Sequence, residues 1–257
     1  IRDSIYRGGS WQPTPAADVV TNIVVPGAVT YDLDLTTLGN HAAFANGNTD
    51  TWGGATMTAI VSDANTAFSV VNGSGAKLNM TASPGGTCGF KLSLADLCGG
   101  LDFDWAIGDW DCYVHFSLPS AGGDTFDVDF AYCIDGSFNG VYAVNSCTAG
   151  ATVGKTVGLG GATITYTGSG QLPVACISKR GGIYSVAFAA SYSGDFPAHS
   201  AMKLLGCDVL NSTNKAVLNG STPPTTLPYF VFFVNSTTIS ATRAVYVQRI
   251  RFVAKAG

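Results

Sequence analysis

The chain of 257 residues carries a formal net charge of −4, and only 12% of its residues are charged, against ~25% in an ordinary soluble domain. All 17 acidic residues are aspartate, so the chain lacks glutamate, a good helix former, and its composition argues against a helical fold. A hydrophobic fraction of 46% excludes intrinsic disorder, and the acidic balance without a basic stripe excludes nucleic acid as a partner.

The N-terminal part of the chain differs from the rest. Residues 1–30 predict an extended N-terminal arm or a leading strand, because the stretch from Ser10 to Ala17 is rich in proline and turn-forming residues. Residues 31–257 predict a single β-sandwich domain, since sandwiches commonly run to ~200–250 residues undivided. No apolar run reaches the ~18 residues that a helix needs to cross a membrane, so we expect no membrane span.

Helical pattern is limited to one short stretch, Leu92 to Leu97, and the segments after it alternate with the period of a β-strand. In Asp111 to Leu118 the even-numbered residues are expected to point inward and the odd-numbered residues outward. In Thr125 to Cys133 the even-numbered, mostly aromatic residues share one face. The odd-numbered residues, which include two aspartates, share the other face.

Three further runs predict strands towards the C-terminal end. In Ile183 to Tyr192 the large side chains, Tyr192 included, share one face and the small ones the other, which indicates close approach of a second layer or a neighbouring subunit. Tyr229 to Val234 is apolar on both faces and predicts a central strand covered on both sides. Ala244 to Val253 predicts a closing strand. Its faces are expected to carry Tyr246, Ile250 and Phe252 on one side and Arg249 and Arg251 on the other.

Seven cysteines are spread along the chain without a CxxC spacing. The odd number leaves at least one thiol unpaired within a monomer. Disulfides in hairpin-sized loops and buried thiols that act as small hydrophobes are both open interpretations.

Charge is segregated along the chain. Between Lys91 and Lys155 there are nine aspartates and no basic residue, whereas basic residues gather at the two ends. Complementary patches of this kind orient association between subunits. One interpretation is therefore an assembly surface, and the other is that the acidic strands lie beside the basic terminal strand in one sheet. The candidate assembly residues are Asp127, Asp129, Arg243, Arg249 and Arg251.

Pairs of aspartates in the acidic stretch are the candidate metal ligands. Asp102 with Asp104, and Asp109 with Asp111, place two carboxylates close together, and hard cations such as Ca²⁺ prefer oxygen ligands. No D-x-[DN]-x-[DN]-G calcium loop is present, and a solvated acidic face explains the same pattern. We therefore expect no cofactor. If a cation were bound by these four residues, Ca²⁺ would suit them.

Three tryptophans are the candidate ligand-binding residues. Trp52 lies in a polar stretch flanked by glycine, and Trp105 and Trp110 bracket a short turn. Aromatic rings beside hydroxyls and carboxylates suit flat ligands with polar edges, such as sugars. The alternative is that these tryptophans belong to the core.

No catalytic constellation is recognisable in the chain. His41, His115 and His199 lack a flanking signature, and no G-x-S-x-G elbow is present. The run from Ala149 to Thr156 ends like a phosphate-binding loop but lacks its first glycine and a following helical pattern. We therefore expect that the protein is not an enzyme.

The strand rhythm carries a resemblance to a known fold family. The segments concerned are Asp111–Leu118, Thr125–Tyr132, Ile183–Phe188 and Ala244–Val253. Their succession resembles the concanavalin-like or laminin-G-like jelly roll found in many lectins and phage virion proteins. The resemblance covers residues 55–257 and implies an all-β, antiparallel two-sheet β-sandwich of jelly-roll type with very little helix. The glucanases of that fold use pairs of glutamates, and no position of this chain inherits those roles.

Composition, segregated charge and the absence of a catalytic motif predict a virion structural protein. We expect a bacteriophage decoration, fibre or tail component that acts through subunit assembly, with host-surface binding as a second role. Its partners would be copies of itself or other virion proteins, together with a surface glycan, and its location the virion or the extracellular space. An extracellular carbohydrate-binding module and a non-viral extracellular filament subunit are the alternatives. An aspartate-dependent glycan lyase or hydrolase is the least favoured hypothesis.

Overall fold

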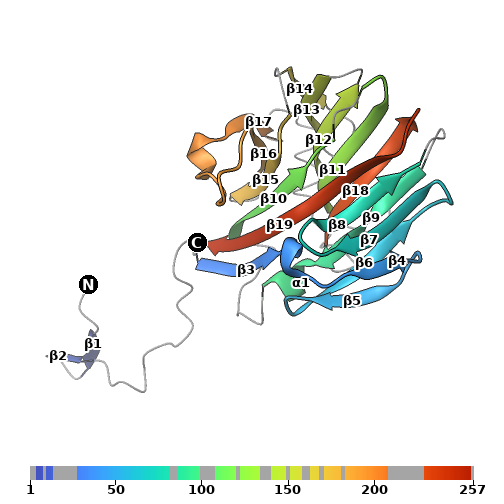
Figure 1. Cartoon of the computed structure of the whole chain (residues 1–257). Coiled ribbons are helices and arrows are strands. Elements are labelled where there is room, and N and C mark those ends of the chain that lie inside the picture. Colours follow the sequence, from blue (N-terminus) through green and yellow to red (C-terminus); the bar gives the residue numbers. More distant parts are fainter. Residues whose placement is uncertain are drawn as a thin grey trace.

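The computed structural model describes residues 4–7, 10–13, 28–81, 86–98, 108–119, 122–133, 140–148, 151–157, 163–167, 171–180, 183–207 and 229–255. Apart from a two-stranded ribbon near the N-terminus, these residues form two antiparallel sheets that pack face to face (Figure 1). The structure confirms the predicted all-β sandwich of jelly-roll type. The helical elements described are η2 (Leu35–Thr37), α1 (Leu94–Leu97) and η3 (His199–Ala201), and none of them is long and apolar enough to cross a membrane.

Sheet I has the strand order β17-β16-β15-β10-β19-β8-β7-β4, and β3 also pairs with β19. One edge of β19 pairs with β10, and the other pairs with β8 along its first half and with β3 along its second half. Three segments that lie far apart in the sequence therefore meet on one strand. The bounds are β3 (Ala28–Asp34), β4 (His41–Phe44), β7 (Thr66–Val71), β8 (Gly75–Met80), β10 (Asp109–Ser117), β15 (Val174–Arg180), β16 (Ile183–Ala189), β17 (Lys203–Cys207) and β19 (Arg243–Lys255).

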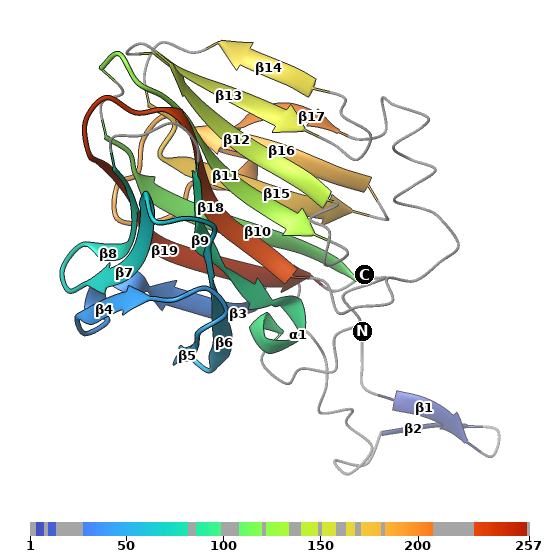
Figure 2. The ribbon, with the colours of Figure 1, turned by 90° about the vertical axis from the view of Figure 1, so that its right-hand side faces the viewer.

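Sheet II has the strand order β14-β13-β12-β11-β18-β9-β6-β5, and β11, β12, β13 and β14 run side by side in Figure 2. Its central strands are β11, β18 and β9, which join through antiparallel ladders, with a shift of register between β11 and β18 at Thr125. The bounds are β5 (Thr49–Trp52), β6 (Ala55–Val61), β9 (Gly86–Ser93), β11 (Thr125–Cys133), β12 (Gly140–Thr148), β13 (Ala151–Val157), β14 (Thr163–Thr167) and β18 (Tyr229–Thr238).

The N-terminal arm predicted for residues 1–30 contains the paired strands β1 (Ser4–Arg7) and β2 (Ser10–Pro13). Its last residues enter β3, which begins at Ala28. The remaining residues before Ala28 lie outside the described residues. The division into an arm and a single domain of residues 31–257 therefore stays a prediction.

Aromatic rings dominate the core between the two sheets. Trp110 of β10 is fully buried, and its ring centroid lies 5.0 Å from that of Tyr132, 5.3 Å from that of Phe230 and 5.9 Å from that of Phe252. Rings at these separations gain stabilisation beyond the area that they bury. The core thus joins β10 and β19 of sheet I to β11 and β18 of sheet II.

The predicted alternation of the residues in β10 and β11 is confirmed. In β11 the even-numbered residues, from Phe126 to Tyr132, lie in the core between the sheets, and in β10 the even-numbered residues do the same. The strand over Tyr229–Val234 is central, as predicted, because β18 lies between β11 and β9.

One face assignment in the closing strand is wrong. Tyr246 was expected on the face of Ile250 and Phe252, but Val245 and Val247 are the buried residues there, and Tyr246 is partly exposed. The ladder between β10 and β19 shifts register at this point, which leaves an extra residue in β19. A β-bulge of this kind exchanges the two faces of the strand on one side of it.

A second face assignment is wrong at the end of β16. Tyr184, Val186 and Phe188 point into the core between the sheets, as expected. Tyr192 packs instead with the small-residue face, because β16 ends at Ala189 and the chain turns there. The expected close approach of a second layer to this small-residue face is present, since Met202 packs on Ala187.

Four of the cysteines are unpaired, buried thiols: Cys88, Cys98, Cys112 and Cys176. Burial raises the pKa of Cys88 to about 12 and that of Cys98 to about 11. At neutral pH these four residues are therefore neutral and pack as small hydrophobic side chains.

Candidate functional site

The outward-facing residues of the central strands of sheet II form a continuous surface, which we call the sheet II face. Residues that alternate with the core residues point to this side. Ala131 of β11, Val231 of β18, Lys91 of β9 and Thr58 of β6 lie side by side across four strands. The register of these ladders fixes which side chains are neighbours on the face.

A hollow of about 200 Å³ opens on the sheet II face. It is lined by Thr56, Thr58, Lys91, Ser93 and Tyr229. The Nζ atom of Lys91 lies 4.9 Å from the centroid of the Tyr229 ring, within the range of a cation–π interaction. Three Thr or Ser hydroxyl groups, one ammonium group and one tyrosine ring with its own hydroxyl therefore border a single small space.

The floor beside the hollow is apolar. Ala131, Cys133, Tyr229 and Val231 are buried on this outer side of sheet II, and the partly buried Ile60 and Phe233 pack against them. A sheet face turned to water usually carries polar residues instead. These residues are already covered within the chain, so the hollow beside them is the candidate site on this face.

Acidic groups lie on the β11 side of the same face. Asp127 pairs in register with Asn235, and Asp129 with Phe233. Asp129 is buried, whereas Asp127 is partly exposed. The sheet II face thus has carboxylates over β11 and an ammonium group over β9, two strands away.

The tryptophans proposed as ligand-binding residues do not come together on this surface. Trp52 and Trp110 are 2% and 0% exposed, so neither ring presents a face to a ligand in solution. The Nε1 atom of Trp52 donates a hydrogen bond to Asp50, and its carbonyl oxygen accepts one from the hydroxyl of Tyr31. These two tryptophans are core residues, and Trp105 lies outside the described residues.

The aspartates proposed as metal ligands divide in a similar way. Asp111 is 1% exposed, and its carboxylate is held by Arg180 at 2.5 Å and by Lys255 at 2.6 Å. Two cations already occupy the oxygens that a metal would need. Asp109 is among the described residues. In that part of the chain, no group of three or more metal-ligating side chains gathers. Asp102 and Asp104 lie outside the described residues.

The arginines proposed for assembly make ion pairs within the chain. Arg243 holds the buried Asp124 at 2.6 Å, and Arg249 and Arg251 both bind Asp32 of β3. None of the three pairs with Asp127 or Asp129 in the described residues. The acidic strand β10 does lie directly beside the basic strand β19, as the second interpretation of the charge pattern expected.

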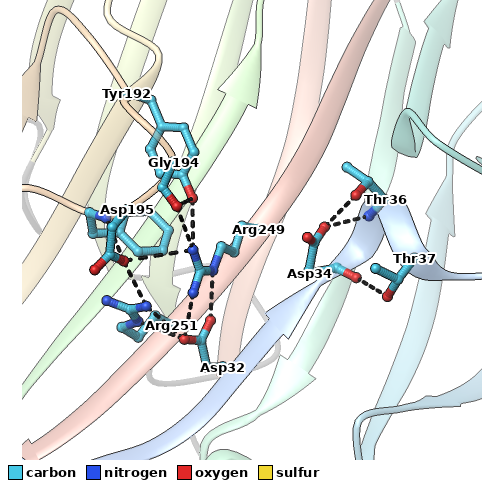
Figure 3. A network of polar contacts seen from close by, with 10 residues as sticks. Asp32, Asp34, Thr36, Thr37, Tyr192, Gly194, Asp195, Arg249 and Arg251 are labelled. Carbon is cyan, nitrogen blue, oxygen red and sulfur yellow. Dashed lines mark hydrogen bonds and ion pairs between the residues drawn. The ribbon is translucent and has the colours of Figure 1, made fainter.

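The ion pairs of Arg249 and Arg251 belong to a larger network on the outer face of sheet I (Figure 3). Arg249 donates to both carboxylate oxygens of Asp32 and to Tyr192 and Gly194, and Arg251 lies 2.8 Å from Asp195. Burial acts to raise the pKa of Asp32, but hydrogen bonds from the two arginines outweigh it and lower that pKa. The neighbouring Asp34 is occupied elsewhere, because it accepts hydrogen bonds from Thr36 at 2.9 and 2.6 Å.

Sequence analysis missed the hollow on the sheet II face. Lys91 and Tyr229 are 138 positions apart, and only the β9–β18 ladder brings them together. The signal that was present is the apolar run from Tyr229, whose odd-numbered residues were expected to be covered. It could not show which strands would lie beside it, since pairing between distant strands leaves no local pattern.

Comparisons with known proteins bear on the fold. No family model and no curated protein matches the chain. Among solved structures, the chain is similar to an endo-β-1,3-glucanase from Pyrococcus furiosus, with 11% identity, full coverage of both chains and a TM-score of 0.49. It is also similar to lectin II from Ulex europaeus, with 10% identity, 89% of this chain and 100% of that chain covered, and a TM-score of 0.47.

A third similar structure is the metal-free form of the VIP36 exoplasmic/lumenal domain. It is 6% identical, 90% of this chain and 95% of that chain are covered, and the TM-score is 0.48. All three likenesses fall below a TM-score of 0.5, so no ligand, metal or activity is carried over from them.

Proposed function

We propose that the protein is a binding protein without enzymatic activity, which holds a saccharide on the sheet II face at the hollow between Lys91 and Tyr229. One observation carries the proposal: an aromatic ring, an ammonium group and three hydroxyl groups converge on one space. Sugars present apolar C–H faces to aromatic rings and hydroxyl groups to polar side chains. The residue types around the hollow therefore suit this class of ligand.

The volume of the hollow limits how much of a glycan it can hold. Its volume of about 200 Å³ lies below the ~300–1,000 Å³ of pockets that enclose a whole small ligand. One ring of a longer glycan would enter it, while the rest of the chain would lie along the sheet II face. The partly buried Ile60 offers an apolar contact for that remainder.

Binding without turnover is supported by the position of the carboxylates. Asp127 and Asp129 lie over β11, and neither lines the hollow. A glycoside hydrolase needs two carboxyl groups that flank the bond to be cleaved. The hollow itself offers Lys91 and hydroxyl groups, which suit recognition.

A glycan array followed by calorimetry on the best ligand tests the proposal. Lys91→Met keeps much of the aliphatic stem but removes the donor, and we expect it to weaken binding about 10-fold, the effect of a lost hydrogen bond from a charged group. Lys77→Met is the matched control, because Lys77 is an equally part-buried strand lysine that lies in sheet I. An array without signal, or equal affinities for Lys91→Met and the unmodified chain, would contradict the proposal.

We further propose that this binding protein is a structural component of a virion, as a bacteriophage decoration, fibre or tail protein. The low charge of the chain supports close packing of copies. The same property would suit an extracellular filament subunit. Measurement of the mass in solution over a range of concentrations tests assembly, and a strictly monomeric chain at high concentration would contradict it.

A further inference from the structure

The connection between β16 and β17, residues 190–202, folds back over the outer face of sheet I instead of projecting from its edge, and we call it the strap. β16 and β17 lie at one end of the sheet order, yet the strap reaches across β15 and β10 as far as β19. Its contacts with these strands are aromatic and ionic. The strap therefore forms a partial third layer on one side of the sandwich (Figure 3).

The far end of the strap is fastened by the two arginines of β19. Asp195 lies 2.8 Å from Arg251 and 3.6 Å from Arg249, and both guanidinium groups lie over the ring of Phe196, at 5.2 and 5.6 Å. Asp32 of β3 holds the same two arginines from below. Asp195 is 69% exposed, so this fastening is accessible to water and is individually weak.

Beneath the strap lies an apolar patch on the outer face of sheet I. Tyr113, Val174, Cys176 and Ala187 are between 0 and 7% exposed there, and Met202 of the strap packs with them. The Phe196 ring lies 5.4 Å from that of Tyr113. Release of the strap would remove the Met202 and Phe196 contacts and expose Cys176, whose thiol is otherwise buried.

A histidine lies under the strap, where burial and Arg249 disfavour its charged form more than Asp34 favours it. The ring of His115 stacks on that of Tyr192 at 3.8 Å and 15°. Its neighbours on sheet I are Arg249 on β19 and the uncharged Val174 on β15. On β3 the nearest acid is Asp34, whose carboxylate is already bound to Thr36. Burial and the nearby Arg249 lower the pKa of His115 to about 4.

A second histidine belongs to the strap itself. The Nε2 atom of His199 is buried and has no hydrogen-bond partner in the structure. The charged groups that face it are Asp111 on β10, Arg180 on β15 and Lys255 on β19, and the two cations already neutralise Asp111. Burial lowers the pKa of His199, so its neutral form is the one that the closed strap accepts.

We propose that the strap is an acid-released cover: protonation of His115 and His199 detaches residues 190–202 from sheet I and exposes the apolar patch around Cys176. The closed form disfavours the two protons, because each would place a positive charge beside arginine or lysine in a partly buried site. The open form accepts them at the ordinary pKa of ~6.5. Mildly acid solution therefore drives opening, independently of any ligand on the sheet II face.

Thiol labelling of Cys176 measures the open fraction. The reagent is 4,4′-dithiodipyridine, which reacts with thiols at acid pH, and mass spectrometry assigns the labelled site. Each rate is divided by that of the urea-unfolded chain at the same pH. We expect the relative rate at Cys176 to rise about 10- to 50-fold from pH 7.5 to pH 4.5, from the linkage of His115 alone. Cys112, which faces the core between the sheets, is expected to stay protected.

Two substitutions distinguish protonation of His115 from other effects of low pH on the chain. His115→Phe keeps a ring for stacking on Tyr192 but cannot be protonated, and we expect it to reduce the rise at Cys176 to a few-fold. His41→Phe is the matched control, since His41 also stacks on an aromatic ring, Phe44, at 3.8 Å but lies at an exposed edge of sheet I. This control is expected to respond to pH like the unmodified chain.

The proposal is overturned by a Cys176 rate that does not change between pH 7.5 and pH 4.5. It is equally overturned if Cys112 becomes reactive in parallel, because that pattern means unfolding of the whole sandwich. If His115→Phe does not fold, the ratio of Cys176 to Cys112 labelling in the unmodified chain still decides between these outcomes.

Discussion

The two outer faces of the sandwich are built in opposite ways. The outer face of sheet I carries arginine, aspartate and histidine and is closed by the strap. The sheet II face carries apolar side chains around a small hollow, and its one charged lining residue is Lys91. Both faces hold buried apolar residues, and they differ in what lies beside them: the strap on sheet I and the hollow at Lys91 and Tyr229 on sheet II.

This difference shows that charge alone does not mark an interaction surface. Arg249 and Arg251 stand out in the sequence, but their charges are neutralised by Asp32 and Asp195 within the same chain. On the sheet II face, the charged residues that stand out in the sequence, Asp127 and Asp129, do not line the hollow. Four substitutions or conditions test how far the two faces differ.

The largest effect is expected from Gly89→Ala at the centre of sheet II. A Cβ atom there would lie 2.6 Å from the Cα atom of Phe233 and still closer to the carbonyl oxygen of Phe232. Because β9 and β18 must separate to admit it, we expect a loss of about 3 kcal/mol in the free energy of unfolding, measured by urea denaturation. Gly39→Ala is the control, since no atom lies within 4 Å of its added Cβ. A loss below about 1 kcal/mol would mean that the strands separate readily.

The next effect compares an aspartate from each outer face. Asp111→Asn leaves Arg180 and Lys255 without their buried anion, and we expect a loss of about 2 kcal/mol, reduced from the cost of a fully buried pair because both cations are a third exposed. Asp127→Asn on the sheet II face is expected to change stability by less than ~0.5 kcal/mol. Equal losses in thermal or urea unfolding would remove the distinction between the faces.

Acidification is expected to lower the free energy of unfolding mainly through groups on sheet I. The pKa of His115 is about 4 when folded and ~6.5 when unfolded, so its stabilisation is complete above pH 6.5 and is lost as the pH falls towards 4. Because the His115 ring is half-exposed, we expect a loss of about 1–2 kcal/mol in the free energy of unfolding between pH 7 and pH 4.5. Asp32, Asp111 and Asp195, whose pKa values are lowered, lose their contributions only below about pH 4. Urea midpoints at a series of pH values give the curve, and a midpoint that rises on acidification would contradict this sign.

The smallest effect is expected from Tyr192→Phe. It removes the hydroxyl that accepts a 2.9 Å hydrogen bond from Arg249, while Asp32 and the carbonyl of Gly194 still bind that guanidinium. We expect a loss of about 0.5–1 kcal/mol. Tyr246→Phe, on the same sheet and partly exposed, is the control and should be neutral. A neutral Tyr192→Phe would show that the hydroxyl of Tyr192 does not contribute to holding the strap.

Local pattern predicted the strands well and their neighbours poorly. The alternation in β10 and β11 and the short helix at Leu94–Leu97 follow from residue type and spacing, so the sequence was sufficient for them. The bulge in β19 depends on its pairing with β10, and for this reason the face of Tyr246 was predicted incorrectly.

The candidate site was beyond local pattern. Trp52 and Trp110 lie near glycines and polar residues in the sequence, which suggested exposed loops, but the second sheet covers both rings. Conversely, Lys91 and Tyr229 show nothing unusual until β9 and β18 pair. Contacts between distant segments decide which residues are buried and which strands lie side by side. Local sequence and composition do not predict these contacts.

The position of β19 has a consequence for the order of folding. This strand follows all of its partners in the chain, and the contact of Arg251 with Asp32 spans 219 positions. During synthesis β3, β8 and β10 leave the ribosome with the edges meant for β19 unpaired. Such edges attract other strands. We expect slow closure of sheet I and a period in which chaperones protect the nascent chain.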